Sequence, residues 1–179
     1  RTIPAARLAE RAEAVLIARQ DVGHVLLIGR LFGGVAGGAL PTQQLFEIGG
    51  QQNLPGYDYK AFAGDRAWIA RGTAQYALPY LGSPFPFIAG FVMPAIAPEL
   101  NFGVQTGMAW ATDDQARAAV RRLGDKVDEV TGEPIIDPDS GEPVPVSVPT
   151  DKLRATASLG VRVLSGAVYL GFALPVDAT

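Results

Sequence analysis

Side chains that commonly carry out catalysis or bind metals are scarce in this chain of 179 residues. It has a single histidine, His24, and no cysteine. Structural and catalytic zinc sites need several such ligands, so we expect His24 to be a turn or interface residue. Ser83 and Ser165 have no base nearby in the sequence, and a serine nucleophile requires one. We therefore predict that the chain is not an enzyme and uses no cofactor or metal.

Other motifs also lack the spacing that binding would need. Asp137, Asp139 and Glu142 lie together in IIDPDSGEP, but the twelve-residue pattern of a calcium loop is missing, and we expect solvated carboxylates. The segment 33–38 (GGVAGG) does not have the G-x-G-x-x-G spacing of a dinucleotide site. The net charge is −3 and the basic residues are scattered, so no nucleic-acid partner is predicted.

A long polar, glycine-rich segment is unusual in a chain that is 48% hydrophobic: residues 46–68 read FEIGGQQNLPGYDYKAFAGDRAW. Gly49, Gly50 and Gly56 can adopt backbone conformations that other residues avoid. Pro55 and Tyr57 lie on either side of Gly56. Taken alone, these residues predict an ordinary surface loop, so its role depends on the elements that flank it.

Alternation with a period of two predicts strands in four segments, 66–80, 100–111, 152–164 and 167–174. In the second of them, Leu100, Phe102 and Val104 share one face, and Asn101 and Gln105 share the other. One face of each segment is apolar, and the opposite face is small and polar.

Two fold classes share this alternation. Strands that are apolar outside and polar inside, with Trp68, Trp110, Tyr76 and Tyr80 towards their ends, are typical of an outer-membrane barrel wall. A soluble antiparallel sheet with one wet face alternates too. A single spanning helix is not expected in residues 72–98, because prolines interrupt the segment.

The remaining segments complete the expected order of elements. His24–Ala36 predicts a strand, and Arg7–Arg19 predicts another strand linked to it through Gln20–Gly23, although its composition also suits a helix. Residues 112–150 begin with a helix-prone stretch and continue as a solvated region rich in proline and acid. Ser165-Gly166 predicts a tight turn.

The order of these motifs resembles one family, the outer-membrane barrel-assembly and protein-translocation family (BamA and TamA type, the bacterial surface antigen domain). Phe46-Glu47-Ile48-Gly49-Gly50 is similar to the loop entrance of that family, and Pro55-Gly56-Tyr57 stands at its Arg-Gly-aromatic motif. Segments 66–79, 101–110 and 153–176 resemble strands of the same barrel. The resemblance covers most of the chain from about His24.

The resemblance implies that the loop folds into the barrel lumen, where the motif Arg pairs with acids on the next two strands. Here Pro55 stands at the Arg position, and Gln75 and Gln105 stand at the positions that match the acids. All three are neutral, so no stranded charge remains in the lumen. We hypothesise that the loop still enters, held by turns at Gly49, Gly50 and Gly56, by stacking of Tyr57, and by amide contacts. The predicted loop motif is Phe46, Gly49, Gly50, Pro55, Gly56 and Tyr57, and its predicted seat is Gln75 and Gln105.

The expected fold is therefore all-β, a segment of about six to seven strands from a larger antiparallel transmembrane β-barrel, with one lumen-directed loop and one long polar loop. We expect residues 1–179 to form one partial barrel domain, with strands and the loop in 24–111, the long loop in 112–150 and the final hairpin in 151–176. Because the chain starts at Arg1, we expect a removed signal or, preferably, an internal piece of a longer chain.

The expected function is the assembly, insertion or translocation of proteins at the bacterial outer membrane. Expected partners are outer-membrane lipid, client outer-membrane or secreted proteins, and periplasmic modules of the same chain. The alternatives are a barrel anchor or passive pore fused to a surface or periplasmic enzyme, and a soluble antiparallel sandwich.

Overall fold

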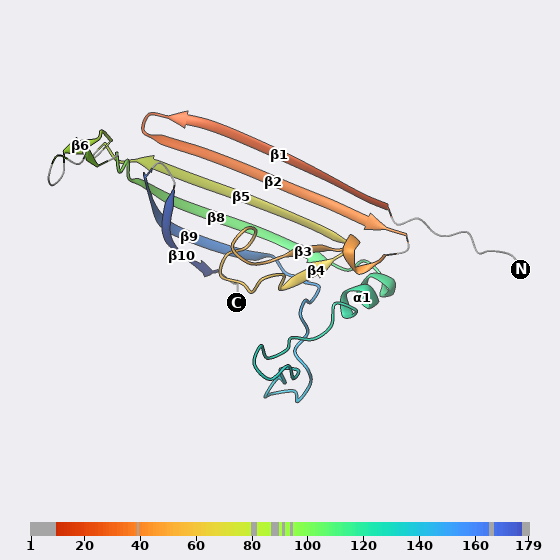
Figure 1. Ribbon diagram of the computed structural model, residues 1–179. Coiled ribbons are helices and arrows are strands. Elements are labelled where there is room, and N and C mark those ends of the chain that lie inside the picture. Colours follow the sequence, from red (N-terminus) through yellow and green to blue (C-terminus); the bar gives the residue numbers. More distant parts are fainter. Residues whose placement is uncertain are drawn as a thin grey trace, which may run out of the picture.

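Six strands form one antiparallel sheet in the order β1-β2-β5-β8-β9-β10 (Figure 1). The computed structural model describes residues 10–38, 40–79, 82–86, 90, 92–93, 95–164 and 167–176. The strands are β1 (Glu10–Val22), β2 (Val25–Gly37), β5 (Arg66–Ala77), β8 (Glu99–Trp110), β9 (Arg154–Val163) and β10 (Val168–Pro175). Each strand pairs with the one that precedes it in this order, so the sheet is a meander. The predicted all-β antiparallel fold is confirmed.

Connections between these strands carry the remaining elements. Between β2 and β5 lie η1 (Thr42–Gln44), β3 (Phe46–Ile48) and β4 (Phe62–Gly64), and β3 pairs with β4. Between β5 and β8 lies a short pair, β6 (Phe85–Pro86) and β7 (Val92–Met93). Helix α1 (Asp114–Arg121) follows β8. It begins where the Asp113 side chain accepts a hydrogen bond from the Ala116 N–H at 2.7 Å, as an N-cap residue does.

In the first hairpin, pairing between strands decides whether the segment around Arg7–Arg19 forms a strand or a helix. The predicted strand over Arg7–Arg19 is confirmed from Glu10 onward, and it continues to Val22. All thirteen residues of β1 pair with β2, and Val22 lies opposite Val25. The link is therefore Gly23-His24, one residue beyond the predicted end of the turn. Ladder pairing over the whole strand outweighs the helix propensity of its Ala, Glu and Leu residues. The predicted turn at Ser165-Gly166 and Tyr80 lie outside the described residues.

The two faces of the sheet are unlike, as the alternation predicted. We call the face that segment 45–65 covers the inner face and the opposite one the outer face. On the inner face of β8, Gln105 is only 2% exposed. On the outer face, Phe102 is 52%, Leu159 44% and Leu170 72% exposed. These apolar side chains have not been gathered into a packed protein centre.

Charged residues of the six strands follow the same division. Arg11 on β1, Arg71 on β5 and Arg162 on β9 all line inner-face cavities. Alternation along each described strand puts the other strand charges on that face too, except Glu10 and Arg66. These two lie opposite Gly37 and Val35 respectively, at the same end of the sheet. Apart from these two residues, the outer face of the described strands carries no charged residue.

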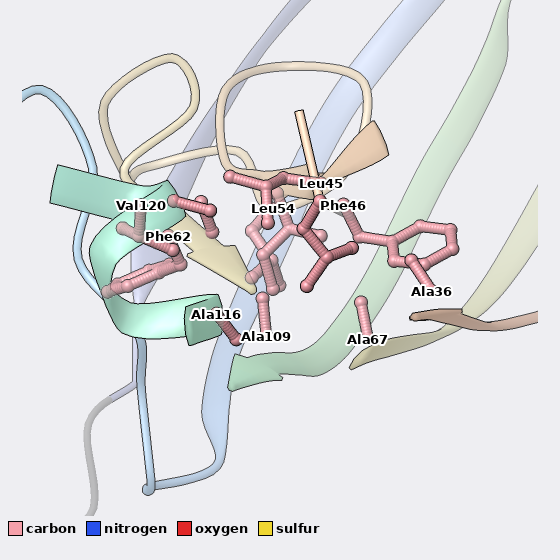
Figure 2. Close-up of a cluster of buried hydrophobic side chains, with 13 residues drawn as sticks. Ala36, Leu45, Phe46, Leu54, Phe62, Ala67, Ala109, Ala116 and Val120 are labelled. Atoms are coloured by element: carbon pink, nitrogen blue, oxygen red, sulfur yellow. The ribbon is translucent and has the colours of Figure 1, made fainter. Parts of the chain in front are cut away.

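The hydrophobic core lies beneath segment 45–65, at one end of the sheet (Figure 2). Ala36 on β2, Ala67 on β5 and Ala109 on β8 provide a floor of small residues, and all three are buried. Phe46 and Leu54 pack into the same cluster. Helix α1 closes the cluster with Ala116, Ala119 and Val120. Among the described residues, no helix has both the length and the hydropathy to cross a membrane.

Candidate functional site

Segment 45–65, which we call the inner loop, is anchored first through Phe46. Its ring lies against Gly34 on β2, in the place that a side chain at position 34 would occupy. The Phe32 ring is 5.9 Å away between centroids, and the Arg11 guanidinium lies 4.2 Å from the Phe46 centroid. Phe46 is 2% exposed. Phe46, at the predicted loop entrance, is therefore a buried anchor. Its ring fits against β2 because residue 34 is a glycine and has no side chain there.

Turns at three glycines reverse the loop. Gly49, Gly50 and Gly56 have φ values of 124°, 79° and 98°, which is the region that favours glycine. At Gly49 the backbone is also crowded, because a Cβ would meet the Asp58 carbonyl oxygen and the Ala61 nitrogen. These backbone angles are those that the turn prediction requires.

The tip of the loop rests on the last two strands. A Cβ at Gly56 would lie 3.0 Å from Pro175 Cδ and 3.2 Å from Thr156 Cγ2. The Tyr57 hydroxyl donates a hydrogen bond to the Ala155 carbonyl oxygen at 3.4 Å, and its ring meets Phe62 edge-on at 5.3 Å. The predicted segment Pro55–Tyr57 is thus held against the inner face rather than splayed away from it.

Gln75 and Gln105 share a cavity with the tip. This cavity of about 820 Å³ is lined by both glutamines and by Pro55 and Gly56. Gln105 donates to the Ser158 hydroxyl at 3.4 Å, and Gln75 lies opposite Asn101 in the ladder. In the described part of the chain, neither glutamine hydrogen-bonds to the inner loop. Gln75 and Gln105 therefore lie in the same cavity as the loop tip, as predicted. The contacts that hold the tip to the sheet, however, are made by Tyr57 with Ala155 and by Gly56 with Pro175 and Thr156.

The long connection between β8 and β9 holds the loop from its other side. Ala63 N donates to the Val148 carbonyl at 3.0 Å, and Val148 N donates to the Ala61 carbonyl at 3.1 Å. Lys126 Nζ lies 2.5 Å from a carboxylate oxygen of Asp58. Sequence reasoning missed this clamp, because residues so distant in the chain give no local signal of contact.

An ion pair within the loop joins β3 to the segment just before β4. Lys60 Nζ lies 2.5 Å from a carboxylate oxygen of Glu47. The hydrogen bond to Glu47 is the largest influence that raises the pKa of Lys60 above its ordinary value, against a smaller opposing effect of burial.

The acid-rich part of the long connection consists of two similar turns. Asp128 Oδ1 accepts hydrogen bonds from Val130 N and Thr131 N at 2.8 Å. Those bonds lower the pKa of Asp128. In the second turn, Asp137 Oδ1 accepts from Asp139 N at 2.8 Å. The recurrence of TGEP and SGEP in the sequence was the signal for this repetition. The carboxylates act here as turn formers, and no group of metal-ligating side chains occurs among the described residues.

Backbone hydrogen bonds join the two turns into one compact unit. Ile135 N donates to the Lys126 carbonyl, Val144 N to that of Ile135, and Lys126 N to that of Val144. The three bonds close a ring, with lengths of 2.8, 2.8 and 2.7 Å. The predicted polar excursion thus has a defined backbone in the structure.

Taken together, the site is a polar inner surface partly covered by a docked loop. Its lining combines amides, hydroxyls and guanidinium groups, which can hydrogen-bond to polar ligands, with apolar side chains such as Ile17, Ile28 and Leu170. No family model matches the chain, and no curated protein sequence matches it.

Proposed function

We propose that the sheet forms part of the wall of a β-barrel in the bacterial outer membrane, which assists the assembly, insertion or translocation of proteins. The inner loop is its plug. The observation that carries this proposal is the division of side chains between the two faces. Leu31, Phe102 and Leu159 are about half exposed on the outer face, with exposures of 48%, 52% and 44%, while strand charges are confined to the inner face except at one end.

Hydrocarbon is the solvent that such an outer face fits best. A soluble monomer rarely exposes a continuous apolar surface that crosses every strand of its sheet. Trp68 and Tyr76 lie on the outer face of β5, and the strand between them spans about 26 Å. In a strand tilted by about 35–45° that length spans about 18–21 Å of height, which fits within the apolar band of an outer-membrane barrel, about 25 Å tall and bordered by aromatic residues.

A role in moving polypeptide is supported by how the loop is held. Its base is packed into the hydrophobic core, and its tip rests on the sheet through the hydrogen bond from Tyr57 to the Ala155 carbonyl and the close approach of Gly56 to Pro175. The tip leaves open a cavity of about 820 Å³ that is lined by both polar and apolar side chains. The resemblance of the motif order to the barrel-assembly and translocation family adds to this argument.

A second candidate is a barrel anchor or passive pore. The neutral residues Pro55, Gln75 and Gln105 favour it, because no ion pair fixes the tip at the position where the resembling family has one. An anchor needs the wall but not a regulated plug.

The wall is tested by moving one charge between the faces. Val104→Arg places a cation on the outer face at the row of Gly72, midway between Trp68 and Tyr76, and a charge there costs about 2–4 kcal/mol in lipid. Thr73→Arg, on the opposite face beside the open cavity, is the matched control. We expect folding into phospholipid vesicles to fail for Val104→Arg and to succeed for Thr73→Arg. Equal folding of both variants would exclude a lipid-facing outer surface.

The two candidate functions are separated by reconstitution of the protein in vesicles. An assembly or translocation component accelerates the conversion of an unfolded outer-membrane protein to its protease-resistant form, relative to empty vesicles. A passive pore releases an entrapped small dye and leaves the client rate unchanged. An anchor does neither.

A further inference from the structure

Two arginines lie directly opposite each other on the inner face. Arg30 on β2 pairs in register with Arg71 on β5. Both line the large cavity beside the loop tip and the smaller cavity beneath the base of the loop. Directly opposed residues of an antiparallel pair have Cβ atoms about 5 Å apart, and like charges in that arrangement are destabilising.

No acidic side chain offsets this repulsion in the described part of the chain. Neither arginine takes part in an ion pair there, and their lateral neighbours in the same row are Ile17 and Gln105. Glu47 lines the smaller cavity, but its carboxylate is paired with Lys60 at 2.5 Å. Two guanidinium groups without an ion-pair partner among the described residues therefore face the open cavity.

Polar atoms without partners continue along the same row of the sheet. Arg71 pairs in register with Gln105, and Gln105 with Thr156. Arg71 Nε, Gln105 Oε1 and Thr156 Oγ1 are buried and have no hydrogen-bond partner among the residues that the structure describes. Buried groups of this kind usually have one. Arg71 and Gln105 line the large cavity, so they place a charged donor beside a neutral acceptor there, whereas Thr156 is fully buried beneath Gly56.

We propose that the part of this row that lines the cavity, Arg30–Arg71–Gln105, binds an acidic side chain of an extended polypeptide. A guanidinium pair matches the two oxygens of a carboxylate. The polypeptide that carries the carboxylate also supplies backbone N–H donors, which the unpartnered Gln105 oxygen needs. Inorganic phosphate at neutral pH offers chiefly acceptors, so it satisfies the arginines but leaves Gln105 unpaired. The identity of the ligand as a polypeptide rests on the proposed function, whereas the anionic character of the site does not.

The test is binding of a fluorescein-labelled eight-residue peptide containing four glutamates, measured by anisotropy. The peptide in which glutamine replaces every glutamate is the ligand control. Arg71→Gln and Arg30→Gln each remove one cation from the pair. Arg19→Gln removes the same charge from the same face but away from the row, because Arg19 lies opposite Ile28. Binding is measured in whichever medium, micelle or buffer, keeps each variant folded by circular dichroism.

The proposal expects the glutamate peptide to bind and the glutamine peptide to bind at least about tenfold more weakly, the scale of one charge-assisted hydrogen bond. Either arginine variant should show a similar loss, and Arg19→Gln should not. Gln105→Leu should weaken peptide binding further than it weakens competition by inorganic phosphate.

Three results would overturn the proposal. They are no binding of the glutamate peptide to the unmodified chain, binding by Arg71→Gln and Arg30→Gln as strong as that of the unmodified chain, or a loss in Arg19→Gln as large as in those two variants. Complete displacement by phosphate, with no effect of Gln105→Leu, would reject a polypeptide ligand. Peptide binding is measured in any medium that keeps the chain folded, so its result does not depend on a membrane. The membrane-wall proposal is tested separately, by whether Val104→Arg and Thr73→Arg differ in folding into vesicles.

Discussion

Asp65 and Thr112 are joined by two hydrogen bonds, although they are separated by 47 residues. The Asp65 carboxylate accepts from Thr112 N at 2.8 Å and from Thr112 Oγ1 at 2.5 Å, and Asp65 is 3% exposed. The backbone carbonyl of Asp65 accepts from Ala36 N at 2.7 Å. One residue therefore ties the end of the inner loop to β2 and to the start of the α1 connection.

Removal of this junction should destabilise the folded chain. Asp65→Ala removes a buried carboxylate and its hydrogen bonds to the exposed residue Thr112, and we expect the free energy of unfolding to fall by about 1–3 kcal/mol. The control, Asp139→Ala, removes a carboxylate from an exposed turn and should change the free energy of unfolding by less than about 0.5 kcal/mol. Urea titrations followed by tryptophan fluorescence measure both. Similar midpoints for the two variants would show that the junction contributes little.

Gly34 and Gly33 offer a matched test of how the loop is anchored. A Cβ at position 34 would collide with the Phe46 ring, whereas a Cβ at position 33 would have no atom within 4 Å. We expect Gly34→Ala to displace Phe46 and expose the inner loop, and Gly33→Ala to leave it in place. Cleavage by trypsin at Lys60 reports the exposure of the loop. Equal cleavage rates in the two variants would contradict the assigned seat of Phe46.

The Lys60–Glu47 pair should make the loop sensitive to alkaline pH. Because the folded state raises the pKa of Lys60, the pair stabilises the chain fully below the unfolded lysine pKa, about 10.4. That stabilisation is lost as the pH rises through the folded pKa. The unfolding midpoint in urea should therefore fall above about pH 10.5 in the unmodified chain, and less so in Glu47→Gln. The same alkaline fall in both chains would show that the pair is not its cause.

Strands and their faces could be predicted from the sequence because each repeats a pattern over many residues. Residues 100–111 alternate between apolar and small or polar side chains, and β8 follows that alternation in its burial. The helix at Asp114–Arg121 was signalled by its composition and by the glycine at 124. The glycines of the inner loop indicated its turns, because few residues other than glycine adopt positive φ values.

Contacts between distant segments could not be predicted in this way. Strands β3 and β4 have three residues each, too few to show any period. The opposition of Arg30 and Arg71 depends on the register between β2 and β5, and a shift of one residue would place one of them on the other face. The clamp of Val148 on the inner loop depends on the path of the long connection, for which the sequence has no periodic signal.

The most direct test of the account is the environment of each residue along β8. Because the chain has no cysteine, single cysteines at positions 100–109 can carry a nitroxide label in vesicle-reconstituted protein, and collisions with oxygen and with a water-soluble nickel complex can be measured. We predict that the even positions, which include Phe102 and Val104, collide chiefly with oxygen, which concentrates in lipid, and that the odd positions do not. Dominant collisions with the nickel complex at the even positions would mean that the apolar face meets water, and would contradict the proposed membrane wall.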